Sequence, residues 1–270
     1  MRRRSIDLSI HSLGEGLREA LRSGATEPDP SVSRQTACTI CRARAGRAES
    51  LLSFKAMKTY FSLEFSHPEE LPAAFKDDDV RYPESLVEHF LQEYTQPGDT
   101  VLDPFAGYGT TLIVAERLGR VPFGVELNGE KVSYVRSRLA QPENLIHGDT
   151  RLLATLDLPV IDFSMTSPPY MNKDDLEDPF TAYRSQGRGY PAYLRDIRSI
   201  YGQLRKHMKP AGTVVLEVAN LKLTGRVTTL AWDVAEEVSK VLHFEGEVVV
   251  CWDKYGYGYD HSYCLVFSAL

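Results

Sequence analysis

Two glycines separated by one residue follow an apolar run in the stretch Thr100-Val-Leu-Asp-Pro-Phe-Ala-Gly-Tyr-Gly-Thr-Thr-Leu112. The run is typical of a strand ending at Asp103, and residues 110–118 are typical of a helix. Because glycine has no Cβ and tolerates positive φ, Gly107 and Gly109 would let a ligand approach the backbone. The first N–H groups of the following helix are free to donate to such a ligand. The turn therefore favours a ligand site, although a glycine pair after a strand also suits an ordinary turn.

Polar side chains mark the ends of three further predicted strands. They are Glu126 near the end of residues 121–127, Asp149 after residues 144–148, and Ser167-Pro-Pro-Tyr170 after residues 161–165. Strands that alternate with helices imply crossover connections in a mostly parallel sheet. Ligands bind such sheets at the carboxyl ends of the strands. We therefore expect one site assembled from four successive strands.

Hydrophobic periodicity predicts an α/β fold. The seven expected strands are residues 100–103, 121–127, 144–148, 161–165, 213–219, 247–252 and 262–268. The expected helices are residues 81–91, 110–118, 129–140, 190–207 and 229–242. Pro83 suits the first helical position of the earliest helix. A short loop joins the last two strands, which should therefore form an antiparallel hairpin beside the parallel strands.

Composition is typical of a globular protein, with 43% hydrophobic and 25% charged residues in 270. The net charge of −6 argues against coating nucleic acid through bulk charge, but a local basic groove is compatible with it. No apolar run approaches the roughly 20 residues that span a bilayer. The N-terminus has no apolar segment of a secretory signal. We therefore expect a cytoplasmic protein that does not bind membranes.

Residues 1–58 differ from the rest and are expected to be a flexible or partly helical extension, with the main domain at residues 59–270. The first 50 residues contain nine arginines and no lysine. This segment could be an arm that binds nucleic acid or a solvated, dispensable tail. Cys38 and Cys41 form a CxxC without a second ligand pair nearby, so no metal site is predicted.

The sequence Asp-Pro-Phe-Ala-Gly-Tyr-Gly-Thr-Thr at residues 103–111, followed by Ser167-Pro-Pro-Tyr170, resembles the amino-methyltransferases of DNA. The resemblance covers about residues 59–270. It implies a Rossmann-like seven-stranded methyltransferase sheet and S-adenosylmethionine (SAM) as cofactor. The Ser-Pro-Pro-Tyr version is most similar to the cytosine-N4 group, rather than to adenine-N6 enzymes. The motif order looks like that of the unpermuted members.

The resemblance implies a set of cofactor-binding residues. Glu126 would accept hydrogen bonds from the ribose hydroxyls, as an acid after the second strand does in dinucleotide sites. Asp149 would accept from the adenine amino group, and Phe105 would pack near the cofactor. The full implied set is Arg81, Tyr82, Ser85, Asp103, Phe105, Gly107, Gly109, Thr110, Thr111, Glu126, Leu127 and Asp149.

Ser167, Pro168, Pro169 and Tyr170 would carry out methyl transfer. The Ser167 hydroxyl and the Pro168 carbonyl would accept hydrogen bonds from an exocyclic amine, whose lone pair is otherwise delocalised into the base. Proline fixes φ, so the turn is stiff. Tyr170 would stack on the base. The methyl group would pass in line from sulfur to nitrogen, on a base that is flipped out or single-stranded.

The expected partner is DNA, for a site-specific enzyme of restriction-modification type. RNA or another amine is the alternative substrate, and a SAM-binding protein without activity is a further one. Residues 171–193 mix basic and aromatic side chains and would face the substrate. Little sequence remains for a recognition domain, so recognition would be short or supplied by a recognition subunit or restriction partner.

Overall fold

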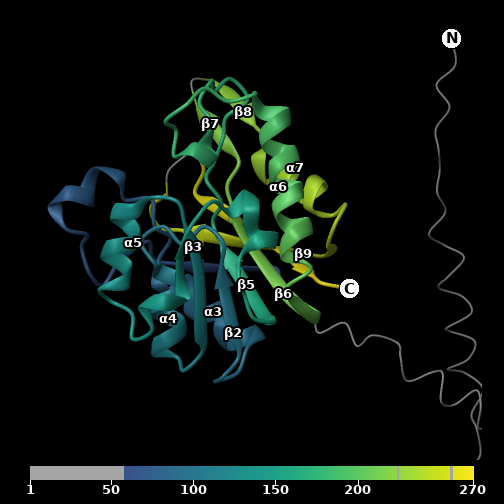
Figure 1. The fold of residues 1–270 in the computed structure, drawn as a ribbon. Coiled ribbons are helices and arrows are strands. Elements are labelled where there is room, and N and C mark those ends of the chain that lie inside the picture. The colour runs from purple at the N-terminus through teal and green to yellow at the C-terminus, as the bar shows by residue number, and fades with distance from the viewer. Residues whose placement is uncertain (1–57, 224, 256–257) are drawn as a thin grey trace, which may run out of the picture. The chain divides into compact units, whose positions relative to one another are not determined.

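The computed structural model describes residues 58–223, 225–255 and 258–270, drawn as a ribbon in Figure 1. Met57–Leu270 forms one compact unit. The rest of the predicted extension, including the pair Cys38 and Cys41, lies outside the described residues. Among the residues that are described, no helix has the length and apolar composition needed to cross a membrane.

An eight-stranded sheet with the order β1-β9-β10-β6-β5-β2-β3-β4 forms the centre of the fold. Its strands are β1 (Tyr60–Leu63), β2 (Thr100–Asp103), β3 (Val121–Glu126), β4 (Leu145–His147), β5 (Ile161–Thr166), β6 (Met208–Val218), β9 (His243–Trp252) and β10 (His261–Ser268). Only β10 runs antiparallel to its neighbours, β6 and β9. All seven predicted strands are present, and the mostly parallel sheet with its C-terminal antiparallel hairpin confirms the predicted fold class.

Three strands go beyond the prediction. The edge strand β1 pairs in parallel with β9, which makes the sheet eight-stranded rather than seven-stranded. Strands β7 (Leu221–Leu223) and β8 (Arg226–Thr228) form a separate antiparallel hairpin directly after β6. This hairpin lies at the upper end of the view in Figure 1, beside the segment that precedes α6.

Helices cover both faces of the sheet. They are α3 (Glu84–Tyr94), α4 (Thr110–Arg117), α5 (Gly129–Arg136), α6 (Tyr190–Leu204) and α7 (Leu230–Val238), with the short 3-10 helix η3 (Thr150–Thr155). Helices α3 and α4 pack on one face, and α6 and α7 pack on the other. Pro83 lies one position before α3 instead of at its first helical position, because its backbone is extended at ψ 146°.

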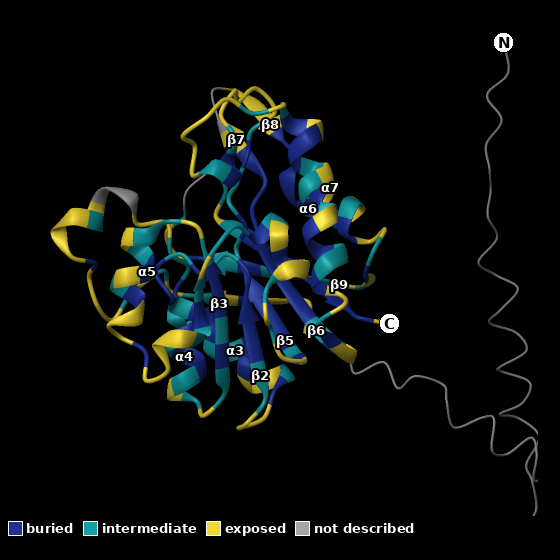
Figure 2. Ribbon diagram, in the orientation of Figure 1, coloured by how far each residue is buried: buried dark blue, intermediate teal, exposed yellow. Residues whose placement is uncertain are grey.

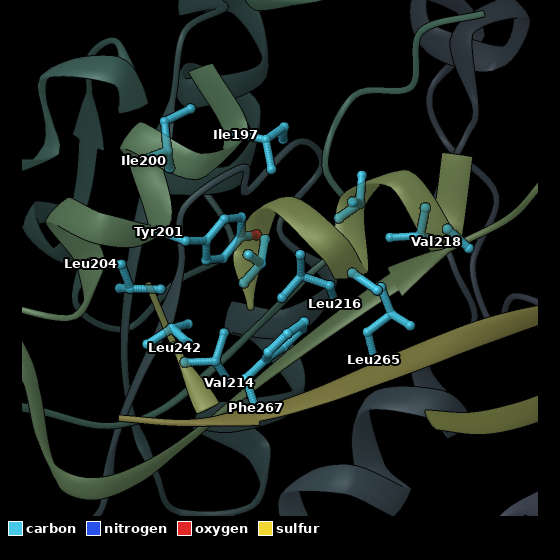
Figure 3. Packing of buried hydrophobic residues seen from close by; sticks show 14 of the residues in the cluster. Ile197, Ile200, Tyr201, Leu204, Val214, Leu216, Val218, Leu242, Leu265 and Phe267 are labelled. Atoms are coloured by element: carbon cyan, nitrogen blue, oxygen red, sulfur yellow. The ribbon is translucent and has the colours of Figure 1, made fainter. Parts of the chain in front are cut away.

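Successive strand residues pack into two hydrophobic cores on opposite faces of the sheet. The first core contains α3 and α4, and the second contains α6 and α7. Val101 packs with α3 and α4, whereas the next residue, Leu102, packs with α6 and α7. Figure 2 shows buried residues along the strands and the inward helix faces, with exposed residues on the outer surfaces. In Figure 3, Ile197, Tyr201 and Leu204 of α6 lie over the sheet residues in the second core. These layers hold the carboxyl ends of the strands in fixed positions.

Candidate active site

A cleft of about 660 Å³ lies at the carboxyl ends of β2, β3, β5 and β6. Thirteen of the sixteen predicted site residues line it: Arg81, Tyr82, Asp103, Phe105, Gly107, Thr110, Glu126, Leu127, Asp149, Ser167, Pro168, Pro169 and Tyr170. Ser85, Gly109 and Thr111 are outside its lining. The structure therefore brings the glycine turn and the Ser-Pro-Pro-Tyr turn into one cavity, although 60 residues separate Gly107 from Ser167.

The two glycines of the turn have different surroundings. Gly107 lines the cleft with φ +53°, and a Cβ there would meet only the Phe105 carbonyl oxygen, at 3.8 Å. Gly109 has φ +79°, and a Cβ there would lie 2.5 Å from Cγ1 of Val135. Gly109 thus allows the start of α4 to pack against α5, while Gly107 keeps the backbone accessible to a ligand.

Asp103 is buried where β2 ends, with an exposed fraction of 2%. It accepts a hydrogen bond from the Phe105 N–H at 2.9 Å and a long one from the Tyr82 hydroxyl at 3.4 Å. The Tyr82 hydroxyl also contacts the Thr111 hydroxyl. Burial raises the pKa of Asp103 from 3.8 to about 6, although its hydrogen bonds oppose this rise. Thr111 therefore supports the site from behind the lining.

The Glu126 carboxylate joins the glycine turn to the start of α5. One oxygen accepts from the Gly107 N–H at 2.8 Å, and the other accepts from the Asn128 N–H at 2.7 Å. Burial raises the pKa of Glu126, and these two N–H groups limit the rise. The Leu127 N–H is a third donor to Glu126, and a carboxylate has about four lone-pair sites, so at least one remains for a ligand hydroxyl.

Two predicted residues are already paired with a charged neighbour. Asp149 accepts a hydrogen bond from the Arg151 side chain at 2.6 Å and another from its N–H at 2.9 Å. Burial opposes ionisation of Asp149, but Arg151 outweighs it and the pKa is lowered. Arg81 likewise donates two 2.8 Å hydrogen bonds to Asp79, which also lines the cleft. The sequence analysis predicted neither pair.

Tyrosine hydroxyls hold the backbone of the Ser167–Tyr170 turn. The Tyr193 hydroxyl donates to the Pro169 carbonyl at 3.0 Å, and the Tyr183 hydroxyl donates to the Tyr170 carbonyl at 2.8 Å. Within the described part of the chain, no donor reaches the Pro168 carbonyl. This carbonyl is therefore available to a ligand at the cleft lining.

Glu217, near the end of β6, is a site residue that the sequence reasoning missed. It lines the cleft, and its exposed fraction is 3%. Its carboxylate accepts hydrogen bonds from the Tyr170 and Tyr255 hydroxyls, each at 2.9 Å. A single acid within the apolar run Thr213-Val-Val-Leu-Glu-Val-Ala219 was the available signal, since an acid is rarely buried without partners.

The segment predicted to face the substrate forms one wall of the cleft. Its lining residues are Pro179, Phe180, Ala182, Tyr183 and Arg184. The Phe180 ring stacks between Phe105 and Tyr193, with centroid distances of 5.9 and 5.3 Å. Arg184 is exposed and, within the described residues, has no acidic partner, whereas Lys173 and Arg188 each pair with an aspartate. Arg184 is thus a basic side chain at the cleft that remains able to bind an anion.

The described residues contain no group of three or more His, Cys, Asp or Glu side chains that could hold a metal ion. The chemistry of the lining instead suits an organic cofactor that carries hydroxyl groups and positive charge. Accessible backbone at Gly107, the acceptor oxygens of Glu126 and the ring of Phe105 provide three kinds of contact for it. Buried Asp103 adds a carboxyl group that a cation would favour in its charged form.

The fold is that of a Rossmann-like methyltransferase. It is similar to the crystal structure of TrmN from Thermus thermophilus, with a TM-score of 0.51 and 17% sequence identity. That comparison covers 69% of this chain and 49% of that chain.

Sequence comparisons match parts of the chain. The family model described as DNA methylase matches residues 55–137. Over 53 residues the chain is 46% identical to the Type II methyltransferase M.BglII of Bacillus subtilis. The aligned segment covers 20% of this chain and 15% of that protein. Over 76 residues it is 36% identical to the Type II methyltransferase M.HpaI of Haemophilus parainfluenzae, covering 28% and 24%.

These matches support the amino-methyltransferase family that the two motifs indicated. S-adenosylmethionine is therefore the cofactor, which confirms the expectation from the sequence. The matched segments span between 15% and 24% of the length of the curated relatives.

Proposed function

We propose that the protein is a DNA methyltransferase that methylates an exocyclic amino group, most favourably N4 of cytosine. The observation that carries this proposal is the single cleft lined by both Gly107 and the Ser167–Tyr170 turn. A cofactor held at the first and an amine held at the second would be adjacent. The similarity to Type II methyltransferases supports DNA as the substrate.

On the target side, the Ser167 hydroxyl and the Pro168 carbonyl would accept hydrogen bonds from the amine. The unbonded Pro168 carbonyl supports this role, because the two carbonyls that follow it are both occupied by tyrosine hydroxyls. Two acceptors would favour a pyramidal nitrogen whose lone pair points away from the base. Positioning of this kind can supply much of a rate acceleration without a covalent intermediate.

On the cofactor side, Glu126 would accept from the ribose hydroxyls, and Gly107 would let the ligand approach the backbone. Asp149 is proposed to lie beside the adenine, where Arg151 competes for its lone pairs. Arg81, Tyr82, Ser85, Thr110 and Thr111 would border the amino-acid arm. When bound, SAM supplies an electrophilic methyl group.

The preference for cytosine rests on Ser167, which occupies the position of an acid or amide in other members of the family. The base would have to leave the duplex, at a cost of a few kcal/mol, or be single-stranded, to enter the cleft. Tyr170 would contact its ring, and Arg184 would bind a neighbouring phosphate at the cleft wall.

The test is incubation of the protein with labelled SAM and either genomic DNA or total RNA, followed by mass spectrometry of the nucleosides. We expect N4-methylcytosine in the DNA. N6-methyladenine would correct the target base, and label only in RNA would overturn the choice of DNA. The matched control is the Ser167→Ala variant, which should give no product.

A further inference from the structure

Glu217 lies behind the Ser-Pro-Pro-Tyr turn and is surrounded by hydroxyl groups. Its two oxygens each accept from one tyrosine, Tyr170 on one side and Tyr255 on the other. The residue is buried, with only 3% of its surface exposed, and yet it lines the cleft. A buried acid needs partners of this kind, so its position is well defined.

The Tyr170 hydroxyl has further neighbours besides the Glu217 carboxylate. The Ala219 N–H donates to it at 3.0 Å, and the Ser167 hydroxyl lies 3.4 Å away. A carboxylate oxygen has no hydrogen to donate, and a backbone N–H can only donate. The 2.9 Å contact with the carboxylate therefore assigns the single hydrogen of the Tyr170 hydroxyl to Glu217 rather than to Ser167, which is 3.4 Å away.

This arrangement fixes the direction of the whole chain of hydrogen bonds. Because the Tyr170 hydroxyl donates its hydrogen to Glu217, it can interact with Ser167 only as an acceptor. The Ser167 hydroxyl then donates its own hydrogen to Tyr170, and its lone pairs remain for a ligand in the cleft. An amine that must donate hydrogen bonds is the ligand that these lone pairs suit.

We propose that Glu217 is the positioning residue that makes Ser167 a hydrogen-bond acceptor toward the target amine, by fixing the orientation of the Tyr170 hydroxyl. This inference rests on the proposed function of the Ser167–Tyr170 turn and deepens it. Tyr255 holds the second oxygen of Glu217, so that the carboxylate does not rotate away from Tyr170.

The test uses the Glu217→Gln variant of the full chain, which keeps the size of the side chain. A glutamine amide can donate to the Tyr170 oxygen, which would let the Tyr170 hydrogen turn toward Ser167 and reverse the chain. We expect kcat to fall by about tenfold or more, the scale of one lost hydrogen bond to a charged group. The Kd for SAM, measured by calorimetry, should stay within about twofold, because Glu217 acts on the target side.

A double-mutant cycle with Tyr170→Phe separates this role from a general structural one. If Glu217 acts through the Tyr170 hydroxyl, Glu217→Gln should reduce kcat little further in the Tyr170→Phe background. Tyr263→Phe is the matched control, since that hydroxyl bonds to His261 outside the cleft and its loss should leave kcat unchanged.

Unchanged kcat in Glu217→Gln, or additive effects in the cycle, would overturn the inference. A parallel loss of SAM binding and thermal stability would also overturn it, because Glu217 would then support the fold. The variants are compared on whichever amine the wild-type protein methylates. A wild-type protein that labels RNA alone would thus refute the proposed substrate, while the cycle still decides the role of Glu217.

Discussion

The backbone N–H of Gly107 donates a 2.8 Å hydrogen bond to the Glu126 carboxylate, which ties the turn after β2 to the end of β3. The second Glu126 oxygen holds the Asn128 N–H at the start of α5. One side chain thus fixes three segments at the cleft, and its remaining lone pairs face the place where we propose that the ribose binds. The predictions below test this arrangement and the turn opposite it.

Glu126→Ala should weaken SAM binding by about 10- to 100-fold, since it removes hydrogen bonds to a charged acceptor worth about 1.5–3 kcal/mol. Isothermal titration calorimetry measures the Kd. Glu130→Ala is the matched control, because Glu130 is an exposed acid of α5 outside the cleft lining. Equal Kd values for wild type and Glu126→Ala would rule out the proposed ribose contact.

Ser167→Ala and Tyr170→Ala should each reduce kcat by at least about 100-fold, the scale seen when one group that stabilises a transition state is removed. SAM should still bind, because both residues lie on the target side of the cleft. Methyl incorporation from labelled cofactor gives kcat, and calorimetry gives the Kd. Ser199→Ala, at an exposed position of α6, serves as the control. Normal turnover in Ser167→Ala would refute the proposed acceptor role.

Gly109→Ala should lower the melting temperature strongly, because the new Cβ would lie 2.5 Å from Cγ1 of Val135 at a φ of +79°. Gly225→Ala is a control for the backbone effect alone, since Gly225 has φ +76° and nothing within 4 Å of an added Cβ. The difference in melting temperature between the two variants measures the effect of the steric clash with Val135. Adding Val135→Ala to Gly109→Ala should restore part of the loss, and equal melting temperatures for the two alanine variants would contradict this packing role.

Asp103 should make folding stability depend on pH in a direction opposite to that of most carboxylates. Its pKa is about 6 in the folded protein, above the ordinary 3.8, so the unfolded chain loses this proton first as pH rises. The wild type should therefore lose stability relative to Asp103→Asn between about pH 4 and pH 6, by up to about 3 kcal/mol. Urea unfolding across this range measures the difference.

Asp162→Asn provides a control of opposite sign. Burial opposes ionisation of Asp162, but hydrogen bonds from the Thr100 N–H and Lys209 lower its pKa. Its carboxylate therefore stabilises the fold above the ordinary pKa, and this contribution is lost as pH falls through the lowered value. A stability difference between wild type and Asp103→Asn that does not change with pH would contradict the assignment for Asp103.

Local patterns were sufficient to predict the parts of the fold that depend on neighbouring residues. The strand that ends at Asp103, the glycine turn and the helix that follows are continuous in sequence, and their order implies the parallel sheet. The edge strand β1 was missed because its four residues gain their partner only from β9, nearly 190 positions later. The β7–β8 hairpin has three-residue strands, too short for a recognisable alternation.

The candidate site likewise contains residues that were predictable from local sequence and residues that were not. Residues within the two motifs were predictable, and most of them line the cleft. Glu217 and Arg151 were not, because their importance comes from partners that the fold brings to them. Tyr255 reaches Glu217 from the loop between β9 and β10, and the sequence indicated only an aromatic-rich hairpin tip there.

The hydroxyls of Tyr183 and Tyr193 donate to two successive carbonyls of the Ser167–Tyr170 turn, although both tyrosines belong to the segment 171–193 that was predicted to face the substrate. If the proposed function holds, grafting a foreign segment here to change the substrate would therefore also alter the geometry of the proposed catalytic turn. A usable graft has to retain both tyrosines and leave only the residues between them open to redesign. The proposed function would thus make substrate choice and turnover depend on the same short segment.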